Sequence, residues 1–216
     1  MSNYSIQPMA VDDLPTHISF LLSSKLSLAV NHFLFKDWPN ETAQRALYSS
    51  AAESGFKSPD SECLKAIDNG SGEMVAHLVL TRKKSVNAGP AAANEGDENP
   101  KPPPEGLDLE FLPHIMKVIK DVEKERAGID HFEVTHIFVK YSSRNRGVGT
   151  MLVQYCLKKA KEAGEPLYIA SEPQAHKFFL GRGFKDTIHS DIDLSKYSPE
   201  HSGFGIFRLQ GMIVEA

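Results

Sequence analysis

The spacing of apolar residues divides the chain into segments that alternate between a strand-like and a helix-like pattern. Short β-branched runs, in which apolar residues are continuous or lie at every second position, predict strands. They occur at residues 5–9, 63–67, 74–81, 132–139, 166–170, 184–188 and 205–214. A tight turn at 68–72, with the sequence Asp-Asn-Gly-Ser-Gly, predicts that the second and third of these strands form a hairpin.

Apolar residues spaced three or four apart predict helices between these strands. We expect helices at residues 14–22, 41–54, 107–127, 150–163 and 173–182, most of which end at a glycine. Residues 190–197 show neither pattern and are expected to form a loop. Strands outnumber helices and their order is mixed, which favours an α+β fold with a largely antiparallel sheet.

One segment, residues 83–106, departs from both patterns. It holds five of the thirteen prolines and no large apolar residue beyond Val86. Such a composition cannot bury enough surface to offset the entropy lost on ordering, so we expect a flexible surface insertion. The insertion is either a mobile lid over an active site or a plain solvated loop. The length of 216 residues suits a single domain that carries this insertion.

The composition is that of an ordinary soluble globular protein, with 41% hydrophobic and 24% charged residues. A net charge of −4 without a basic stripe argues against nucleic-acid binding. No apolar stretch approaches the length of a membrane span, and residues 2–13 lack the apolar core of a signal peptide. Two cysteines, Cys63 and Cys156, do not make a disulfide framework. We therefore expect an intracellular, cytoplasmic protein, and the sequence leaves the nucleus open.

The most informative stretch is a basic turn between the strand at 132–139 and the helix at 150–163. It reads Arg144-Asn145-Arg146-Gly147-Val148-Gly149. Glycines let the backbone approach a ligand closely, and the first N–H groups of the helix have no partner inside the helix. Together with the helix dipole, these donors favour a phosphate or pyrophosphate. A phosphate-loop NTPase is excluded because no Gly-Lys-Ser/Thr follows the turn.

The strand, turn and helix resemble the GCN5-related N-acetyltransferase (GNAT) superfamily, whose signature is Gln/Arg-x-x-Gly-x-Gly/Ala. Residues 170–184, which include Ser171 and end in Gly183-Phe184, resemble the later strand–helix unit of that superfamily. The clear match covers residues 132–184. The resemblance implies a mixed, largely antiparallel sheet between helices in three layers, and acetyl-CoA as co-substrate without a metal.

The resemblance also implies which residues hold the co-substrate. Backbone N–H groups at the turn would bind the pyrophosphate, with Arg144 or Arg146 adding charge. The backbone of the preceding strand would pair with the pantetheine arm and polarise the thioester carbonyl. The residues concerned are Asn145, Arg146, Gly147, Val148, Gly149 and Thr150 at the turn, and Ile137, Phe138 and Val139 in the strand.

Acetyl transfer to an amine needs a base. Glu133 lies six residues before Val139, the spacing at which histone acetyltransferases of the superfamily carry their base. Strict alternation along the strand would put Glu133 on the same face as Ile137, with His136 on the opposite face. We therefore expect Glu133 to be the base. The alternative is a glutamate at the start of the strand that is salt-bridged or solvated.

The expected proton donor is absent. The superfamily's usual tyrosine falls on Phe179, which cannot donate a proton. Ser171, His176 and Tyr155 are the candidates to replace it, unless water protonates the leaving thiolate. On the acceptor side, Phe33, Phe35 and Trp38 either pack in the core or wall a substrate pocket together with Phe179.

The leading hypothesis is an acetyl-CoA-dependent N-acetyltransferase that acts on a small-molecule amine by direct attack in a ternary complex. No cysteine is expected near the mouth of the turn, which argues against a ping-pong route. Two alternatives stay open. One is a non-catalytic CoA-binding or sensing module, and the other is an acetyltransferase of protein lysines or N-termini. The protein could be a monomer or a homodimer that pairs through a sheet edge.

Overall fold

The computed structural model describes residues 3–85 and 103–216. In this part of the chain seven strands form one sheet in the order β1-β2-β3-β4-β5-β7-β6. The strands are β1 (Tyr4–Pro8), β2 (Ser61–Asp68), β3 (Met74–Lys83), β4 (His131–Val139), β5 (Leu167–Ser171), β6 (Lys185–Asp193) and β7 (Ile206–Val214). Among these described strands only β4 and β5 run parallel, so the prediction of a mixed, largely antiparallel sheet is confirmed.

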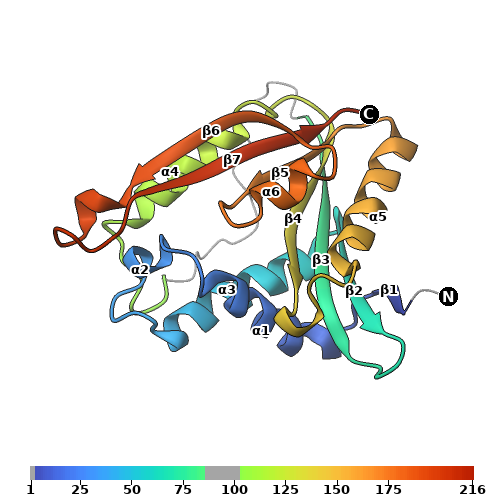
Figure 1. Cartoon of the computed structure of the whole chain (residues 1–216), viewed down its shortest axis with the longest axis horizontal. Helices are drawn as coiled ribbons and strands as arrows, with labels where there is room; N and C mark the ends of the chain where they lie inside the picture. The colour runs from blue at the N-terminus through green and yellow to red at the C-terminus, as the bar shows by residue number, and fades with distance from the viewer. Residues whose placement is uncertain (1–2, 86–102) are drawn as a thin grey trace.

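Helices cover both faces of the sheet (Figure 1). The helix α5 lies against the middle strands on one face, while α1 and α3 lie on the other, and α4 covers β6 and β7. The helices are α1 (Leu14–Lys25), α2 (Asn31–Leu34), α3 (Glu41–Lys57), α4 (Leu112–Glu123), α5 (Val148–Ala163) and α6 (His176–Leu180). Three short 3-10 turns are η1 (Val11–Asp13), η2 (Tyr141–Ser143) and η3 (Leu194–Tyr197).

The hydrophobic core has two parts. The first joins α5 and α6 to the middle strands, and Leu152, Val153 and Cys156 of α5 are fully buried in it. The second joins α2, α4 and the end of the β6–β7 hairpin, with Phe35 and Leu194 at its centre. Each such side chain stabilises the fold by roughly 1.5–3 kcal/mol relative to its exposed form.

Most expected elements differ from the structure by a few residues at their ends, and two differ by more. The helix predicted at 107–127 begins only at Leu112, because the Asp108 side chain accepts hydrogen bonds from the N–H groups of Glu110 and Phe111 and forms a turn there. The loop expected at 190–197 is wrong for its first half. There β6 continues to Asp193, which pairs with Ile206.

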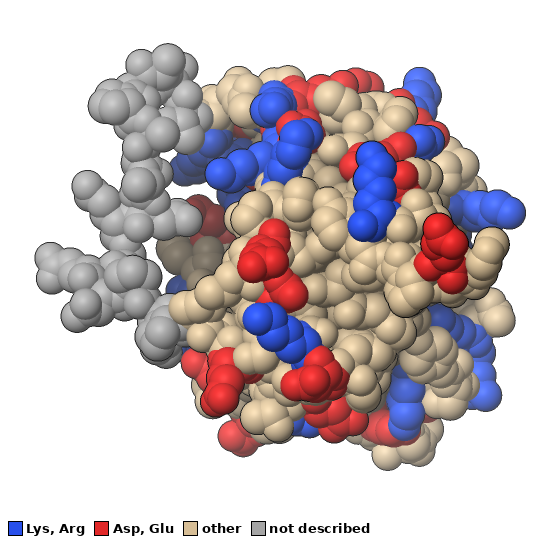
Figure 2. Space-filling view, turned by 90° about the vertical axis from the view of Figure 1, so that its left-hand side faces the viewer, with Lys and Arg blue, Asp and Glu red and all other residues tan. Residues whose placement is uncertain are grey.

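The expected insertion at 83–106 is tested only at its ends. The strand β3 runs on through Lys83, and an isolated bridge joins Leu107 to Phe35. Residues 86–102 lie outside the described part of the chain, and with them the expectation of a flexible loop or lid. Among the helices that are described, none is long and apolar enough to cross a membrane. On the face seen in Figure 2, acidic and basic side chains are interspersed.

Candidate active site

The sheet opens between its two parallel strands. Only Phe132 with Leu167 and Glu133 with Tyr168 are paired across β4 and β5. Beyond Glu133 the strands separate, and among the described residues no other strand pairs with that side of β4. A cavity of about 450 Å³ fills the opening, lined by residues of both strands. The divergence thus exposes a strand edge and creates a binding space beside it.

A bulge in β4 decides which side chains face this cavity. The pairing with β3 shifts by one residue, so that Val134 lies opposite Leu80 while His136 lies opposite Val79. Thr135 is the extra residue, and its hydroxyl bonds to Thr81 at 2.8 Å. Past the bulge the alternation is inverted. The prediction that Glu133 shares a face with Ile137 and that His136 faces away is therefore wrong: Ile137 packs in the core with α5, and His136 lies on the side of α1.

The basic turn forms a row of backbone donors at the end of β4. Asn145 and Gly147 adopt left-handed conformations, with φ of 60° and 85°, and α5 begins directly after Gly147. Within the described chain, none of the N–H groups at residues 145–150 has a hydrogen-bond acceptor, whereas that of Met151 bonds to the Gly147 carbonyl at 2.9 Å. Such a row of free donors at a helix start suits a phosphate group, as the sequence predicts.

The close contact between α6 and the start of α5 depends on the small size of Gly149. A Cβ atom at this position would lie 3.0 Å from the ring of Phe178 in α6, a tighter contact than most real Cβ atoms make. Phe178 in turn carries the guanidinium of Arg182, whose Cζ lies 3.5 Å from the ring centroid. The contact locks α6 against the first turn of α5. The turn and the following strand–helix unit therefore form one surface.

Arg182 is a residue of this surface that the sequence reasoning missed. Its Nη2 donates to the Thr150 hydroxyl at 2.6 Å, and its Nη1 donates to the Phe178 carbonyl at 2.6 Å. Its Nε is buried and has no partner in the described chain. Burial lowers the pKa of the guanidinium. The two flanking glycines, Gly181 and Gly183, were its only sequence signal, and they do not indicate a contact with α5.

The predicted arginines lie at the outer side of the turn. Arg146 is exposed, and Arg144 stacks on Tyr141 with its Cζ 3.9 Å from the ring centroid. The Nε of Arg144 also donates to the Val139 carbonyl at 3.1 Å. This carbonyl belongs to the strand segment expected to pair with a pantetheine arm. Its oxygen has two lone pairs, so the bond from Arg144 leaves one free for that pairing.

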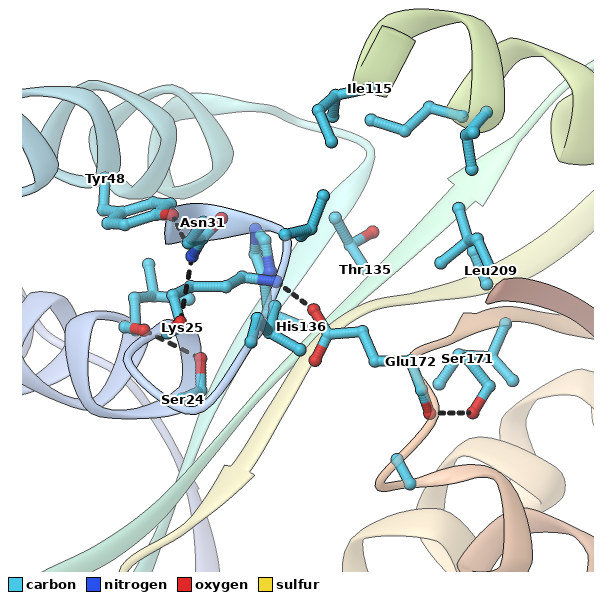
Figure 3. A pocket seen from close by; sticks show the side chains of 18 of the residues that line it. Ser24, Lys25, Asn31, Tyr48, Ile115, Thr135, His136, Ser171, Glu172 and Leu209 are labelled. Carbon is cyan, nitrogen blue, oxygen red and sulfur yellow. Dashed lines mark hydrogen bonds and ion pairs between the residues drawn. The ribbon is translucent and has the colours of Figure 1, made fainter. Parts of the chain in front are cut away.

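The cavity has apolar walls and one polar end. Its walls come from α4 and from the segment around α2, including Ile115, Met116 and Leu34. At the polar end, Lys25 of α1 extends to Glu172, which follows β5, and His136 lies beside this ion pair (Figure 3). The arrangement can enclose a small, largely apolar molecule and offer it polar groups at one end, from α1, the β4 bulge and the end of β5.

Three histidines lie together on the α1 side of the sheet. The Nδ1 atoms of His17 and His77 share one hydrogen bond of 2.8 Å, and the Nε2 atom of buried His77 has no partner in the described chain. Burial lowers the pKa of His17 to about 4 and that of His136 to about 3, with the Lys25 charge contributing at His136. Burial also holds the pKa of His77 far below its usual value. All three are neutral near pH 7, so His136 can accept a proton only from a strongly acidic group.

Comparison with known proteins places this geometry in a family. A family model described as an acetyltransferase (GNAT) domain matches residues 121–193, the stretch that holds β4, the basic turn, α5, β5 and α6. This stretch matches the GNAT acetyltransferase domain, and the chain as a whole shares the fold of solved GNAT proteins. A search of curated proteins found no match.

Solved structures support the GNAT fold over the whole chain. A protein assigned as arylalkylamine N-acetyltransferase 7 of the mosquito Aedes aegypti has a TM-score of 0.67 at 14% identity, covering 98% of this chain and 87% of the other. A protein described as histone acetyltransferase HPA2 and related acetyltransferase, from Corynebacterium glutamicum, has a TM-score of 0.61 at 16% identity, covering 100% and 98%. The ribosomal-protein-S18-alanine N-acetyltransferase of Escherichia coli has a TM-score of 0.52 at 11% identity, covering 98% and 93%.

Within the GNAT fold, the predicted base lies outside the cavity. Glu133 accepts a hydrogen bond of 2.6 Å from Arg126, whose side chain is 5% exposed. Both line a separate hollow of about 650 Å³ with Lys83 and His131. This is the salt-bridged alternative that the sequence left open. The role of Glu133 as a base stays a prediction, and its position gives that role no support.

The candidates for the general acid differ in whether they line the cavity. Ser171 lines the cavity, is 1% exposed and donates to the Glu172 carbonyl at 3.2 Å. Phe179 also lines it, buried against Phe184. His176 instead bonds to Asp186 at 2.7 Å, and Tyr155 donates to Glu62 at 2.6 Å, both away from the cavity. Ser171 is therefore the one sequence candidate for the acid that this cavity brings to the site.

The aromatic residues of the acceptor side pack in the second core. Phe35 is 1% exposed, Phe33 contacts Phe111 and Phe204, and Trp38 stacks on His32. None of Phe33, Phe35 and Trp38 is among the described residues that line the cavity. The packing interpretation is the one that the structure favours.

The residues present fit CoA and give no indication of a metal site. The row of N–H donors and the Arg182 side chain offer positive charge to a pyrophosphate, and the unpaired edge of β4 offers backbone groups to an extended arm. Among the described residues, no group of three or more His, Cys, Asp and Glu side chains is placed to hold a metal ion.

Proposed function

We propose that the protein is an acetyl-CoA-dependent N-acetyltransferase that acetylates a small-molecule amine by direct attack in a ternary complex. One observation carries the proposal. The opening between β4 and β5 runs from the basic turn at one end to the cavity at the other. About 13 Å of strand edge, from Val139 back to Thr135, joins the two. A donor bound along this edge would present its thioester at the polar end of the cavity.

Each part of the opening has a role in this proposal. N–H groups of residues 145–150 bind the pyrophosphate, and the backbone of Ile137, Phe138 and Val139 holds the pantetheine arm. In the reaction, the amine nitrogen attacks the thioester carbon, a C–N bond forms, and the C–S bond breaks. The nitrogen loses a proton to a base and the leaving sulfur gains one.

We assign the base role to His136 in preference to Glu133. His136 lies at the polar end of the cavity beside Lys25, and it is neutral at working pH. Glu133 is already paired with Arg126. Ser171 is the proposed proton donor to the sulfur, because its hydroxyl lies on the β5 wall of the same cavity.

The shape of the cavity supports a small acceptor. Its volume of about 450 Å³ lies in the range of small-molecule pockets, and its walls are mainly apolar. An acetyltransferase of protein lysines or N-termini needs a groove for a peptide on either side of the reacting amine. The apolar enclosure formed with α4 suits a compact molecule better.

A second candidate is a CoA-binding module without turnover. Phe179 favours it, because this buried residue stands where GNAT enzymes usually carry a tyrosine and has no hydroxyl group. The two functions differ in one measurement. Both predict CoA binding, and only the enzyme predicts release of thiol that depends on an amine.

The test is incubation of the protein with acetyl-CoA and a panel of small amines, with free thiol followed by a chromogenic disulfide. We expect thiol release above the hydrolysis rate for some amines, and an acetylated amine by mass spectrometry. Tight CoA binding by calorimetry without amine-dependent release would favour the binding module. Absence of CoA binding would contradict both functions.

A further inference from the structure

The polar end of the cavity contains an ion pair that the proposed reaction does not use. Among the described residues that line the cavity, Lys25 and Glu172 are the only Lys, Arg, Asp or Glu. They bond to each other across the opening, from the last turn of α1 to the segment after β5 (Figure 3). Their side chains are 24% and 23% exposed. The single anion of the cavity is therefore already paired with its single cation.

Neighbouring groups add no further charge to this end. From β3 and β4, His77 and His136 are neutral, and burial with the nearby Lys25 charge opposes their protonation. From α3, the Tyr48 hydroxyl accepts a hydrogen bond from Asn31 at 3.1 Å, and burial raises its pKa. The other oxygen of Glu172 accepts a bond from Gln174 at 3.0 Å. No free carboxylate faces the cavity among these described groups.

This charge balance discriminates between amines. An alkylamine is an ammonium ion near neutral pH, so it must leave water and enter a mainly apolar space without a free counter-charge. Such a transfer is costly unless the ion is paired. An aromatic amine is uncharged near neutral pH, because its nitrogen lone pair is delocalised into the ring. Its transfer leaves no charge to be compensated.

We propose that Lys25 neutralises Glu172 and thereby makes the cavity selective for amines that are uncharged at neutral pH, of the arylamine class, over alkylammonium ions. The inference rests on the proposed acetyltransferase function. Lys25 is a specificity-determining residue in this view, because its ammonium group occupies the place beside Glu172 that a cationic substrate would need.

The chemistry of attack agrees with this selection. The nitrogen of an arylamine carries its lone pair without prior loss of a proton. It becomes strongly acidic only after the C–N bond has formed, and its proton then passes to a neutral imidazole. His136 is suited to that transfer, although its lowered pKa makes it a poor base toward an alkylammonium ion.

The test compares aniline with cyclohexylamine, which share a six-membered ring and an amino group but differ in charge at pH 7. Acetylation by the wild-type protein should favour aniline by roughly tenfold or more in kcat/KM. Lys25→Met frees Glu172, so it should shift the ratio toward cyclohexylamine by roughly tenfold or more. The double variant Lys25→Met/Glu172→Gln removes the freed anion and should reverse much of that shift.

A matched control is Lys65→Met. Lys65 pairs with Asp13 at 2.7 Å, with side chains 17% and 18% exposed, and neither residue lines the cavity. This variant should leave the ratio of the two amines unchanged. Thermal unfolding of all variants shows whether each is folded.

Three outcomes would overturn the inference: a wild-type preference for cyclohexylamine, an unchanged ratio in Lys25→Met, or acetylation of alkylamines in the panel with no activity on aniline. If no amine at all is acetylated, the proposed function fails instead. Calorimetric titration of the two ring amines then still decides the inference. Aniline should bind the wild-type protein more tightly than cyclohexylamine, and Lys25→Met should narrow or invert that difference.

Discussion

The two ends of the opening between β4 and β5 are built in different ways. The donor end consists of consecutive backbone N–H groups at residues 145–150, with the positive charge of Arg182 beside them. The acceptor end consists of side chains from α1, β4, α4 and the segment after β5. Its charged pair, Lys25 and Glu172, comes from positions 147 residues apart. A backbone site binds a chemical group that every donor shares, whereas a side-chain site selects among acceptors.

The two ends also differ in charge: the donor end is positive and the acceptor end is neutral. The donor end offers positive charge and free donors with no anion among its described partners, so it is prepared for a phosphate. The acceptor end is neutral because its ions are paired and its histidines are uncharged. Changes at the donor end should therefore act on CoA affinity, and changes at the acceptor end on turnover and amine choice.

The largest effect is expected from His136→Gln at the acceptor end. Loss of a positioned base should lower kcat by roughly 10²- to 10⁴-fold, while the dissociation constant for CoA stays the same. The measurement is steady-state kinetics of thiol release together with calorimetric CoA binding. His176→Gln is the control, because His176 bonds to Asp186 away from the cavity.

The competing assignment is tested by Glu133→Gln. This change removes the nearer of the two carboxylates that pair with buried Arg126, the other being Glu123. It should therefore lower the unfolding free energy by about 1–3 kcal/mol and leave kcat of the folded protein close to wild type. The opposite pattern, with kcat abolished by Glu133→Gln and retained by His136→Gln, would restore Glu133 as the base.

At the donor end, Gly147→Val should weaken CoA binding by roughly 100-fold. Gly147 has a φ of 85°, and a β-branched residue there forces the turn out of the left-handed region and redirects its N–H groups. Calorimetry measures the affinity for CoA, which reports on the donor end. The kcat at saturating acetyl-CoA reports on the acceptor end. Only the affinity should change.

The same helix provides the control for this variant. Gly164 follows the other end of α5 with a φ of 67°, and neither glycine has an atom near the position of an added Cβ. Gly164→Val therefore introduces a comparable backbone strain far from the turn. If both variants lose CoA affinity equally, the loss reflects the stability of α5 and the phosphate site at 145–150 is refuted.

The contrast between the two ends also explains what the sequence could predict. The donor end is contiguous, so Arg144 to Gly149 predicted both its position and its geometry. The hairpin of the second and third strands and the mixed, largely antiparallel sheet also followed from local patterns. The acceptor end depends on residues that meet only in three dimensions. Lys25 has no neighbouring residue that marks it as part of a site. Glu172 lies next to the candidate Ser171, but nothing local indicates its contact with α1.

The bulge at Thr135 is the clearest case of a feature that the sequence did not reveal. The segment from Phe132 to Val139 reads as a regular strand, and counting by twos placed Glu133 with Ile137. One extra residue inverts the faces and brings His136 to the cavity. The choice between two candidate bases thus depended on a register shift that arises from pairing with β3, which no local pattern in β4 encodes.

The stability of the protein should depend on pH through His17, one of the three histidines on the α1 side of the sheet. His17 has a pKa of about 4 in the folded protein against 6.5 for the free side chain, because it is buried. The unfolded chain therefore binds more protons below pH 6.5, and stability falls as the pH falls toward 4. Between pH 7 and 5 this histidine alone should remove about 2 kcal/mol of unfolding free energy.

Urea unfolding at pH 7, 6 and 5 measures this loss. His17→Asn can keep a hydrogen bond to His77 without a titrating ring, so its stability should decline less over the same interval. Equal declines in the wild-type protein and the variant would show that His17 is not the group responsible. Histidine titration would then have to act elsewhere in the fold.

The smallest effect is expected from Arg182, where the two kinds of site meet. It is a side chain, yet it serves the backbone site by bonding to Thr150 and stacking on Phe178 beside Gly149. Its buried Nε lacks a partner in the described chain, which is the state of a group that awaits an anion or water.

Arg182→Met should weaken CoA binding by roughly tenfold and leave amine selectivity unchanged. Arg182→Lys, which keeps the charge without the planar fork, should recover part of the affinity. If Arg182→Met instead changes the ratio of aniline to cyclohexylamine turnover, the division between a donor end and an acceptor end does not hold at α6.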